Sequence, residues 1–143
     1  MTGVDLKKFD EVVDYHMKWR FVNPNSHFFT YLAKSSIEDG VYKIGFSRNP
    51  IAREKTMKGG YKHYKFKVTH FIVGCYEYMV LNALFTAGVK TPIPIFPKMP
   101  RYREAVYLSE KEVAHIIEKC GFIPIERFDE IKNHSQPDGK EDS

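Results

Sequence analysis

Cysteine is scarce in this chain, because Cys75 and Cys120 are the two among 143 residues and neither belongs to a C-x-x-C motif. Two isolated cysteines are too few for a disulfide-rich secreted scaffold or a structural zinc site. No apolar run approaches the ~18 residues that a membrane-spanning helix requires. The acidic residues near the N-terminus are also foreign to signal and transit peptides. These absences predict an intracellular protein of the cytoplasm or nucleus that does not bind membranes.

The abundant residues favour one folded domain. Hydrophobic residues make up 43% of the chain and charged residues 28%. A chain of this length buries about two thirds of its unfolded surface, so it can form a core without metal or disulfide bonds.

The net charge of +4 is unevenly distributed. From Arg48 to Lys67 there are seven basic residues and one acid, a net +6, whereas the rest of the chain has 15 basic and 17 acidic residues, a net −2. Aromatic residues interleave with these lysines, which suits a polyanion with stackable bases. The same pattern also fits an amphipathic strand in which Tyr64, Phe66 and Val68 point inward and the lysines face solvent. Both interpretations remain open.

Hydrophobic periodicity and turn residues predict alternating helices and strands. Asn49-Pro50 is typical of a helix start, and Ser109-x-x-Glu112 is a capping box. The predicted helices cover 4–19, 50–58, 76–85 and 109–120, and the predicted strands cover 27–34, 41–47, 65–73 and 102–108. This order indicates an α+β fold with a short, mainly antiparallel sheet flanked by helices and an added N-terminal helix. We expect an N-terminal helix and linker at 1–25, a central domain at 26–122 and a partly disordered C-terminal extension at 123–143.

Four polar residues stand at a spacing that suggests a site. Tyr31 lies on the first strand, twelve residues before Lys43 in the segment Lys43-Ile44-Gly45-Phe46-Ser47. Arg53 follows Gly45 by eight residues, and Glu77 falls in the first turn of a later helix. Strand alternation puts Lys43 and Gly45 on one face, and we expect Tyr31 to share it.

The arrangement resembles the GIY-YIG nuclease superfamily, especially the phage- and large-virus-associated branch whose second motif reads K-I-G. Phe29-Thr30-Tyr31 stands in the place of G-I-Y, and Lys43-Ile44-Gly45 in the place of Y-I-G. The resemblance covers residues 28–121. It implies a small GIY-YIG-like domain with divalent-metal-dependent endonuclease activity on DNA.

The chemistry of the four residues agrees with this resemblance. Arg53 would contact a phosphate in bidentate geometry, and Glu77 would supply the one hard oxygen ligand that Mg²⁺ or Mn²⁺ needs from protein. Tyr31 or Lys43 would handle the proton of the attacking water. Tyr31, Lys43, Arg53 and Glu77 are therefore the predicted catalytic residues, with Glu77 as the metal ligand.

Basic residues beside these positions are predicted to contact the nucleic acid. DNA is the expected partner. The choice of target would depend on DNA shape or on a second protein that supplies specificity. The predicted contact residues are Arg48, Lys55, Lys58, Lys62, Lys65, Arg101 and Arg103.

Each site residue also has a purely structural interpretation. Tyr31 can be a packed strand aromatic with its hydroxyl at the surface, and Lys43 an exposed strand lysine. Arg53 can be a helix-surface charge, and Glu77 a favourable charge at a helix N-terminus. The alternative to an enzyme is therefore a catalytically inactive GIY-YIG-like module that binds nucleic acid or a protein.

Overall fold

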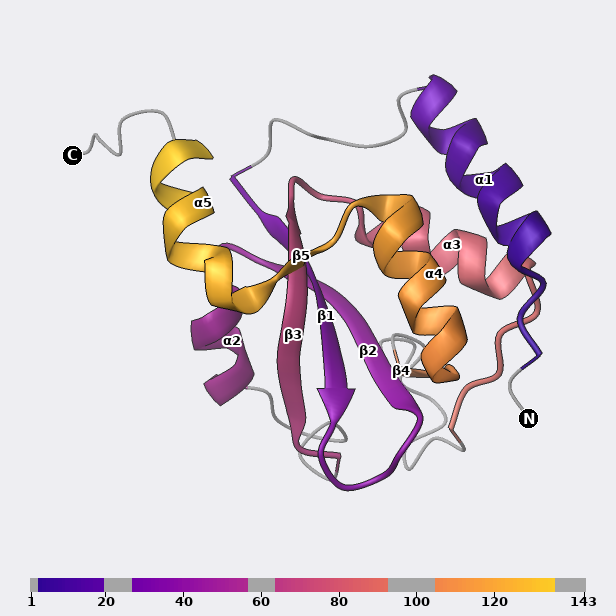
Figure 1. Ribbon diagram of the computed structural model, residues 1–143, viewed down its shortest axis with the longest axis horizontal. Coiled ribbons are helices and arrows are strands. Elements are labelled where there is room, and N and C mark those ends of the chain that lie inside the picture. Colours follow the sequence, from indigo (N-terminus) through magenta and orange to yellow (C-terminus); the bar gives the residue numbers. More distant parts are fainter. Residues whose placement is uncertain (1–2, 20–26, 57–63, 93–104, 136–143) are drawn as a thin grey trace.

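Helices and strands alternate along the chain as the hydrophobic pattern predicts (Figure 1). The computed structural model describes residues 3–19, 27–56, 64–92 and 105–135. The strands are β1 (Phe29–Ser35), β2 (Val41–Ser47), β3 (Phe66–Val73), β4 (Ala105–Tyr107) and β5 (Ile123–Pro124). The helices are α1 (Leu6–Trp19), α2 (Pro50–Thr56), α3 (Glu77–Thr86), α4 (Glu110–Cys120), the 3₁₀ turn η3 (Ile125–Arg127) and α5 (Phe128–Ser135). Residues 57–58, 102–104 and 136–143 of the predicted elements and tail lie outside the described residues.

The strands form one five-stranded sheet in the order β4-β2-β1-β3-β5, and every neighbouring pair is antiparallel. The predicted α+β class with an antiparallel sheet is confirmed. β1 is the central strand and pairs with β2 through a hairpin and with β3 on its other side. The β1–β3 register shifts between Leu32 and Ala33, as at a β-bulge.

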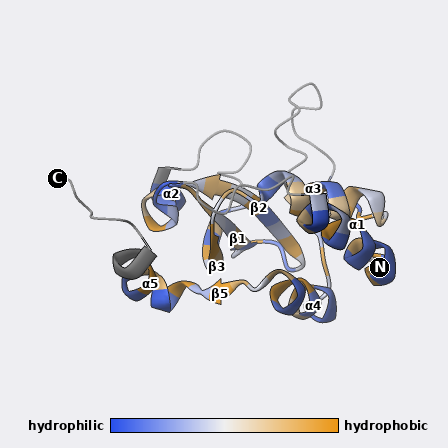
Figure 2. Ribbon diagram, turned by 90° about the horizontal axis from the view of Figure 1, so that it is seen from above, coloured by the Kyte–Doolittle hydropathy of each residue, from blue (hydrophilic) through white to orange (hydrophobic). Residues whose placement is uncertain are grey.

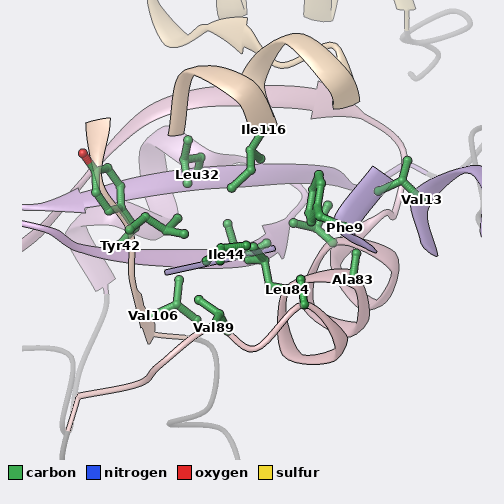
Figure 3. Packing of buried hydrophobic residues seen from close by; sticks show 14 of the residues in the cluster. Phe9, Val13, Leu32, Tyr42, Ile44, Ala83, Leu84, Val89, Val106 and Ile116 are labelled. Atoms are coloured by element: carbon green, nitrogen blue, oxygen red, sulfur yellow. The ribbon is translucent and has the colours of Figure 1, made fainter. Parts of the chain in front are cut away.

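One face of the sheet packs against α1, α3 and α4, which lie together on the right of Figure 1. Leu32, Tyr42 and Ile44 project from β1 and β2 into this core (Figure 3). Phe9 of α1 and Leu84 of α3 meet them there, and both are fully buried. Tyr42 thus faces away from its neighbour Lys43, as strand alternation predicts.

The other face carries two smaller clusters. The first contains Tyr31, Ala33 and Phe66, and the second is formed by Phe29, Phe71 and Phe128. Figures 1 and 2 show α2 and α5 on this side of the strands. Because strand residues alternate between faces, Leu32 faces the first core while its neighbours Tyr31 and Ala33 face the other side.

The N-terminal helix is attached to the rest of the chain at both ends. The backbone N–H of Val4 donates to Glu112 Oε2 (2.8 Å), and that of Asp5 donates to the carbonyl of Ala87 (3.0 Å). Further along α1, Asn82 of α3 hydrogen-bonds His16 (2.9 Å). The helix is therefore packed into the main core.

The local signals at α4 act as predicted. The Ser109 hydroxyl accepts from the N–H of Glu112, and Glu112 accepts from the N–H of Ser109, which completes the capping box. Gly121 ends the helix in the left-handed conformation, with φ 76°. The following β5, η3 and α5 were not anticipated, because two strand residues and an eight-residue helix carry little periodic signal.

No helix in the described part of the chain is long and apolar enough to cross a membrane.

Candidate functional site

Tyr31 and Lys43 lie in direct contact on the sheet face that carries α2. The Lys43 Nζ donates a hydrogen bond of 2.9 Å to the Tyr31 hydroxyl. The strand register explains this contact, because Tyr31 is opposite Gly45 and Lys43 is opposite Ala33, one step along the same face. The expectation that Tyr31 and Lys43 share a face is confirmed.

Gly45 is what allows the two side chains to meet. A Cβ atom at this position would lie 2.5 Å from both Cζ and the hydroxyl of Tyr31, and 2.7 Å from the Lys43 Nζ. Atoms cannot approach this closely without displacement, so a larger residue would push the pair apart. The glycine of the K-I-G segment therefore has a steric role in the site.

The pair is buried, with 1% of Tyr31 and 5% of Lys43 exposed. The interpretations of Lys43 as an exposed strand lysine and of Tyr31 as an aromatic with a surface hydroxyl are thus wrong. A buried ammonium must be hydrogen-bonded to offset its lost hydration, and the Tyr31 oxygen meets part of that need.

Arg53 belongs to α2 and is exposed. Its helix begins as predicted, because Asn49 Oδ1 accepts from the N–H of Ala52 (3.1 Å). One residue further on, Glu54 Oε1 accepts from the N–H of Val68 (2.7 Å) and ties α2 to β3. The helix is thus held on the Tyr31 face while Arg53 faces outward.

Glu77 is the first residue of α3 and is half-buried, with its Oε2 atom inside the protein. Thr30 of β1 fixes this helix start, because its hydroxyl donates to the Gly74 carbonyl (2.8 Å) and accepts from the Tyr76 N–H (2.6 Å). The core residues of α3 pack on the sheet face opposite Tyr31. Glu77 therefore starts an element of the other layer.

A basic and aromatic surface follows β2. The Arg48 guanidinium lies 5.4 Å from the ring centre of Phe28, which in turn meets Phe46 edge to face at 5.3 Å. Phe46 is 37% exposed, and Arg48 is also exposed. An arginine beside a half-buried ring, with an exposed ring next to it, suits both phosphate contact and base stacking.

The remaining predicted contact residues divide into two groups. Lys55 and Lys65 are exposed, as DNA contact requires. Between Tyr64 and Val68, however, Phe66 and Val68 are buried and Lys67 is exposed, so this stretch has the alternation of an amphipathic strand. Lys58, Lys62, Arg101 and Arg103 lie outside the described residues.

Two tyrosines outside the predicted catalytic set pack against the Tyr31 cluster: Tyr64, which the amphipathic pattern placed inward, and Tyr107, to which the sequence reasoning gave no role. Burial, with the nearby Glu38 carboxylate adding to it, raises the pKa of both hydroxyls above the usual 10. Both phenols therefore stay protonated at neutral pH and act only as hydrogen-bonding or packing groups. In the sequence, their aromatic character near a basic segment was the only signal that they belong to the candidate site.

Metal-ligating side chains do not cluster among the described residues: no group of three or more His, Cys, Asp and Glu residues lies together there. Glu77 is the single acid of the predicted catalytic set.

Comparison with known proteins found no match to a family model, to a curated protein or to a solved structure. The interpretation of the site rests on its own geometry.

Proposed function

We propose that the chain is a divalent-metal-dependent endonuclease of the GIY-YIG type that hydrolyses phosphodiester bonds in DNA. The observation that carries the proposal is the 2.9 Å contact of Lys43 Nζ with the Tyr31 hydroxyl beside Gly45. The sequence spacing that suggested Tyr31 and Lys43 corresponds to two polar side chains in contact, on the sheet face that carries α2.

The Tyr31–Lys43 contact gives the tyrosine a defined role. A tyrosine hydroxyl has one hydrogen to donate and two lone pairs to accept with. Lys43 occupies one lone pair, so the Tyr31 hydrogen and its second lone pair would contact a water or a phosphate oxygen that reaches into the buried site. Tyr31 would orient the attacking water, and Lys43 would hold Tyr31 in position.

The exposed arginines supply the phosphate contacts. Arg53 would bind the scissile phosphate through two parallel N–H donors and neutralise the charge that builds up during attack. Arg48, with Phe28 and Phe46, would hold the adjoining strand. Together they would align the phosphodiester over the sheet face that carries Tyr31.

A metal ion that takes one protein ligand would be held by Glu77 at the start of α3. Magnesium commonly binds through one or two carboxylates and completes its coordination with water and phosphate oxygens. Glu77 would hold the ion, because it is the only carboxylate of the set. When bound, such an ion polarises the phosphate and stabilises the leaving oxygen.

The burial of the Tyr31–Lys43 pair favours a second candidate function. With 1% and 5% exposure, the two side chains also fit a purely structural role inside the sheet layer. The chain would then be a catalytically inactive module that binds DNA through Arg48, Lys55 and Lys65, or that binds a protein.

A nicking assay tests the first proposal. Purified protein is incubated with supercoiled, linear and branched DNA in Mg²⁺ or Mn²⁺, and compared with Tyr31→Phe, Arg53→Gln and Glu77→Gln. We expect metal-dependent nicking that falls about 100-fold or more in the variants, as when one transition-state contact is removed. Arg127→Gln is the control, because Arg127 is an exposed arginine of η3. Circular dichroism confirms that each variant folds.

Absence of metal-dependent nicking above the variants, on all three DNA forms, would refute the endonuclease. Titration at several salt concentrations then tests the inactive module. Its affinity for duplex DNA should fall with a slope of about −0.9 per neutralised phosphate.

A further inference from the structure

Two lysines face each other on neighbouring strands, on the side of the sheet that carries α1, α3 and α4. Lys34 of β1 and Lys67 of β3 are direct partners in the antiparallel register. Lys34 follows Leu32 on the same face, and Leu32 belongs to the core formed with those helices. Like charges at directly opposite positions destabilise a sheet. An anion between the two ammonium groups would remove this repulsion.

The two lysines line a hollow of about 440 Å³ at the end of the sheet where β1 leads into the hairpin turn. This volume lies within the range of ~300–1,000 Å³ that small-molecule pockets occupy. The lining residues are Lys34, Ser35, Ser36, Ile37, Asp39, Lys67 and Thr69.

The hydroxyl groups of the hollow are already committed to the backbone. Ser35 donates to the Tyr64 carbonyl (2.7 Å), and Ser36 donates to the Lys65 carbonyl (2.8 Å). Thr69 likewise donates to the carbonyl of Leu32 (3.2 Å). The two ammonium groups are therefore the side-chain donors left to hold an anion.

The charge balance of the hollow is positive. Within the described residues, the ion pairs join other side chains and include neither Lys34 nor Lys67. Asp39 is the one acid among the lining residues, so two positive charges face one negative charge.

We propose that this hollow binds the phosphate group of a nucleotide between the ammonium groups of Lys34 and Lys67. A phosphate dianion carries the charge that two ammonium groups neutralise, and its several oxygens accept from both. The exposed side chain of Ile37 and the lysine stems provide an apolar wall for the sugar and base. The site lies on the face opposite the Tyr31–Lys43 pair, so it does not depend on the proposed cleavage.

Binding of AMP, with adenosine as the uncharged control, tests the site by NMR titration of labelled protein. We expect saturable AMP shifts at residues 34–39 and 67–69, weakening as salt rises, and none with adenosine. Lys34→Gln and Lys67→Gln should weaken AMP binding about tenfold or more, whereas Asp39→Asn should strengthen it. Lys8→Gln, an exposed lysine of α1, is the matched control and should bind as wild type does.

The Lys67→Glu variant gives an independent readout, because it places opposite charges across the strands. The free variant should melt at a higher temperature than wild type, and AMP should no longer raise its melting temperature. A (dT)₈ oligonucleotide identifies the source of the phosphate. If (dT)₈ binds more tightly than AMP, and this binding is lost in the same variants, the natural ligand is a nucleic-acid strand. If (dT)₈ binds as AMP does or more weakly, the natural ligand is a free nucleotide.

Unsaturable AMP shifts, or equal AMP affinity in wild type, Lys67→Gln and Lys67→Glu, would overturn the proposal. Failure of the endonuclease is distinguishable, since Tyr31→Phe and Glu77→Gln should retain full AMP binding.

Discussion

Gly45 faces two side chains that leave no space for a Cβ atom, so the stability of the protein should be sensitive to substitution at this position. Gly45→Ala should lower the free energy of unfolding by about 1–3 kcal/mol, as overpacking does in a well-packed interior. Urea denaturation measures the effect. In a Tyr31→Leu background the same change should cost less, because the atoms that the new methyl group meets at 2.5 Å are gone. Equal costs in both backgrounds would contradict the steric account.

His70 makes stability depend on pH. Burial lowers the pKa of its imidazole below the usual 6.5, and the Glu126 carboxylate opposes the shift only in part. The unfolded chain therefore binds a proton more readily than the folded chain between these two pKa values. Stability from this group is complete above pH 6.5 and is lost as pH falls through that window.

His70→Asn tests this contribution, because the Asn side-chain N–H can replace the Nδ1–H that donates to the Thr69 hydroxyl (2.9 Å), whose own hydrogen goes to the Leu32 carbonyl. Urea denaturation between pH 7.5 and 5 should show a smaller loss of stability on acidification in the variant than in wild type. Parallel pH profiles would show that His70 does not contribute.

At the scale of elements, Glu112 joins two helices through a single carboxylate. One oxygen completes the α4 cap with the Ser109 N–H (2.9 Å), and the other accepts from the Val4 N–H (2.8 Å). The capping box was readable from the sequence, because it is a local pattern of four residues. The link to Val4 was not, because 108 positions separate the partners.

Glu112→Gln should therefore destabilise the protein more than a surface change does. An amide keeps one acceptor oxygen and turns an NH₂ toward a backbone donor, which costs about 1–3 kcal/mol for the unsatisfied group. Glu118→Gln, an exposed position on the same helix, should stay within about 0.5 kcal/mol of wild type in the same thermal or urea measurement. Equal losses of stability in the two variants would mean that the buried Glu112 bridge does not stabilise the fold.

At the scale of the whole molecule, Phe128 connects the C-terminal part of the chain to the sheet. Its ring meets Phe29 of β1 at 5.0 Å and Phe71 of β3 at 5.2 Å, both edge to face. Phe128→Ala should lower the free energy of unfolding by about 3–5 kcal/mol, as for other buried aromatics. Phe85→Ala, at a 39% exposed position, should cost much less. A similar cost at both positions would contradict the packing of α5 on the sheet.

The sequence by itself determined the features that depend on neighbours along the chain. Alternation of apolar residues placed the strands, and local caps placed the starts of α2 and α4, because these signals act over a few residues. Strand alternation also placed Tyr42 and Lys43 on opposite faces of the sheet. Lys43 and Gly45 could be assigned to one face for the same reason, and Tyr31 was expected to share it.

Only the tertiary structure decided which distant segments meet. The strand order, the addition of β5, the burial of Lys43 and the Lys34–Lys67 register each depend on pairings between residues far apart in sequence. Such pairings are selected by the packing of all layers at once, and no local pattern encodes them. Glu77 shows the difference: its helix position was predictable, but the layer in which α3 packs was decided by the core it shares with α1 and α4.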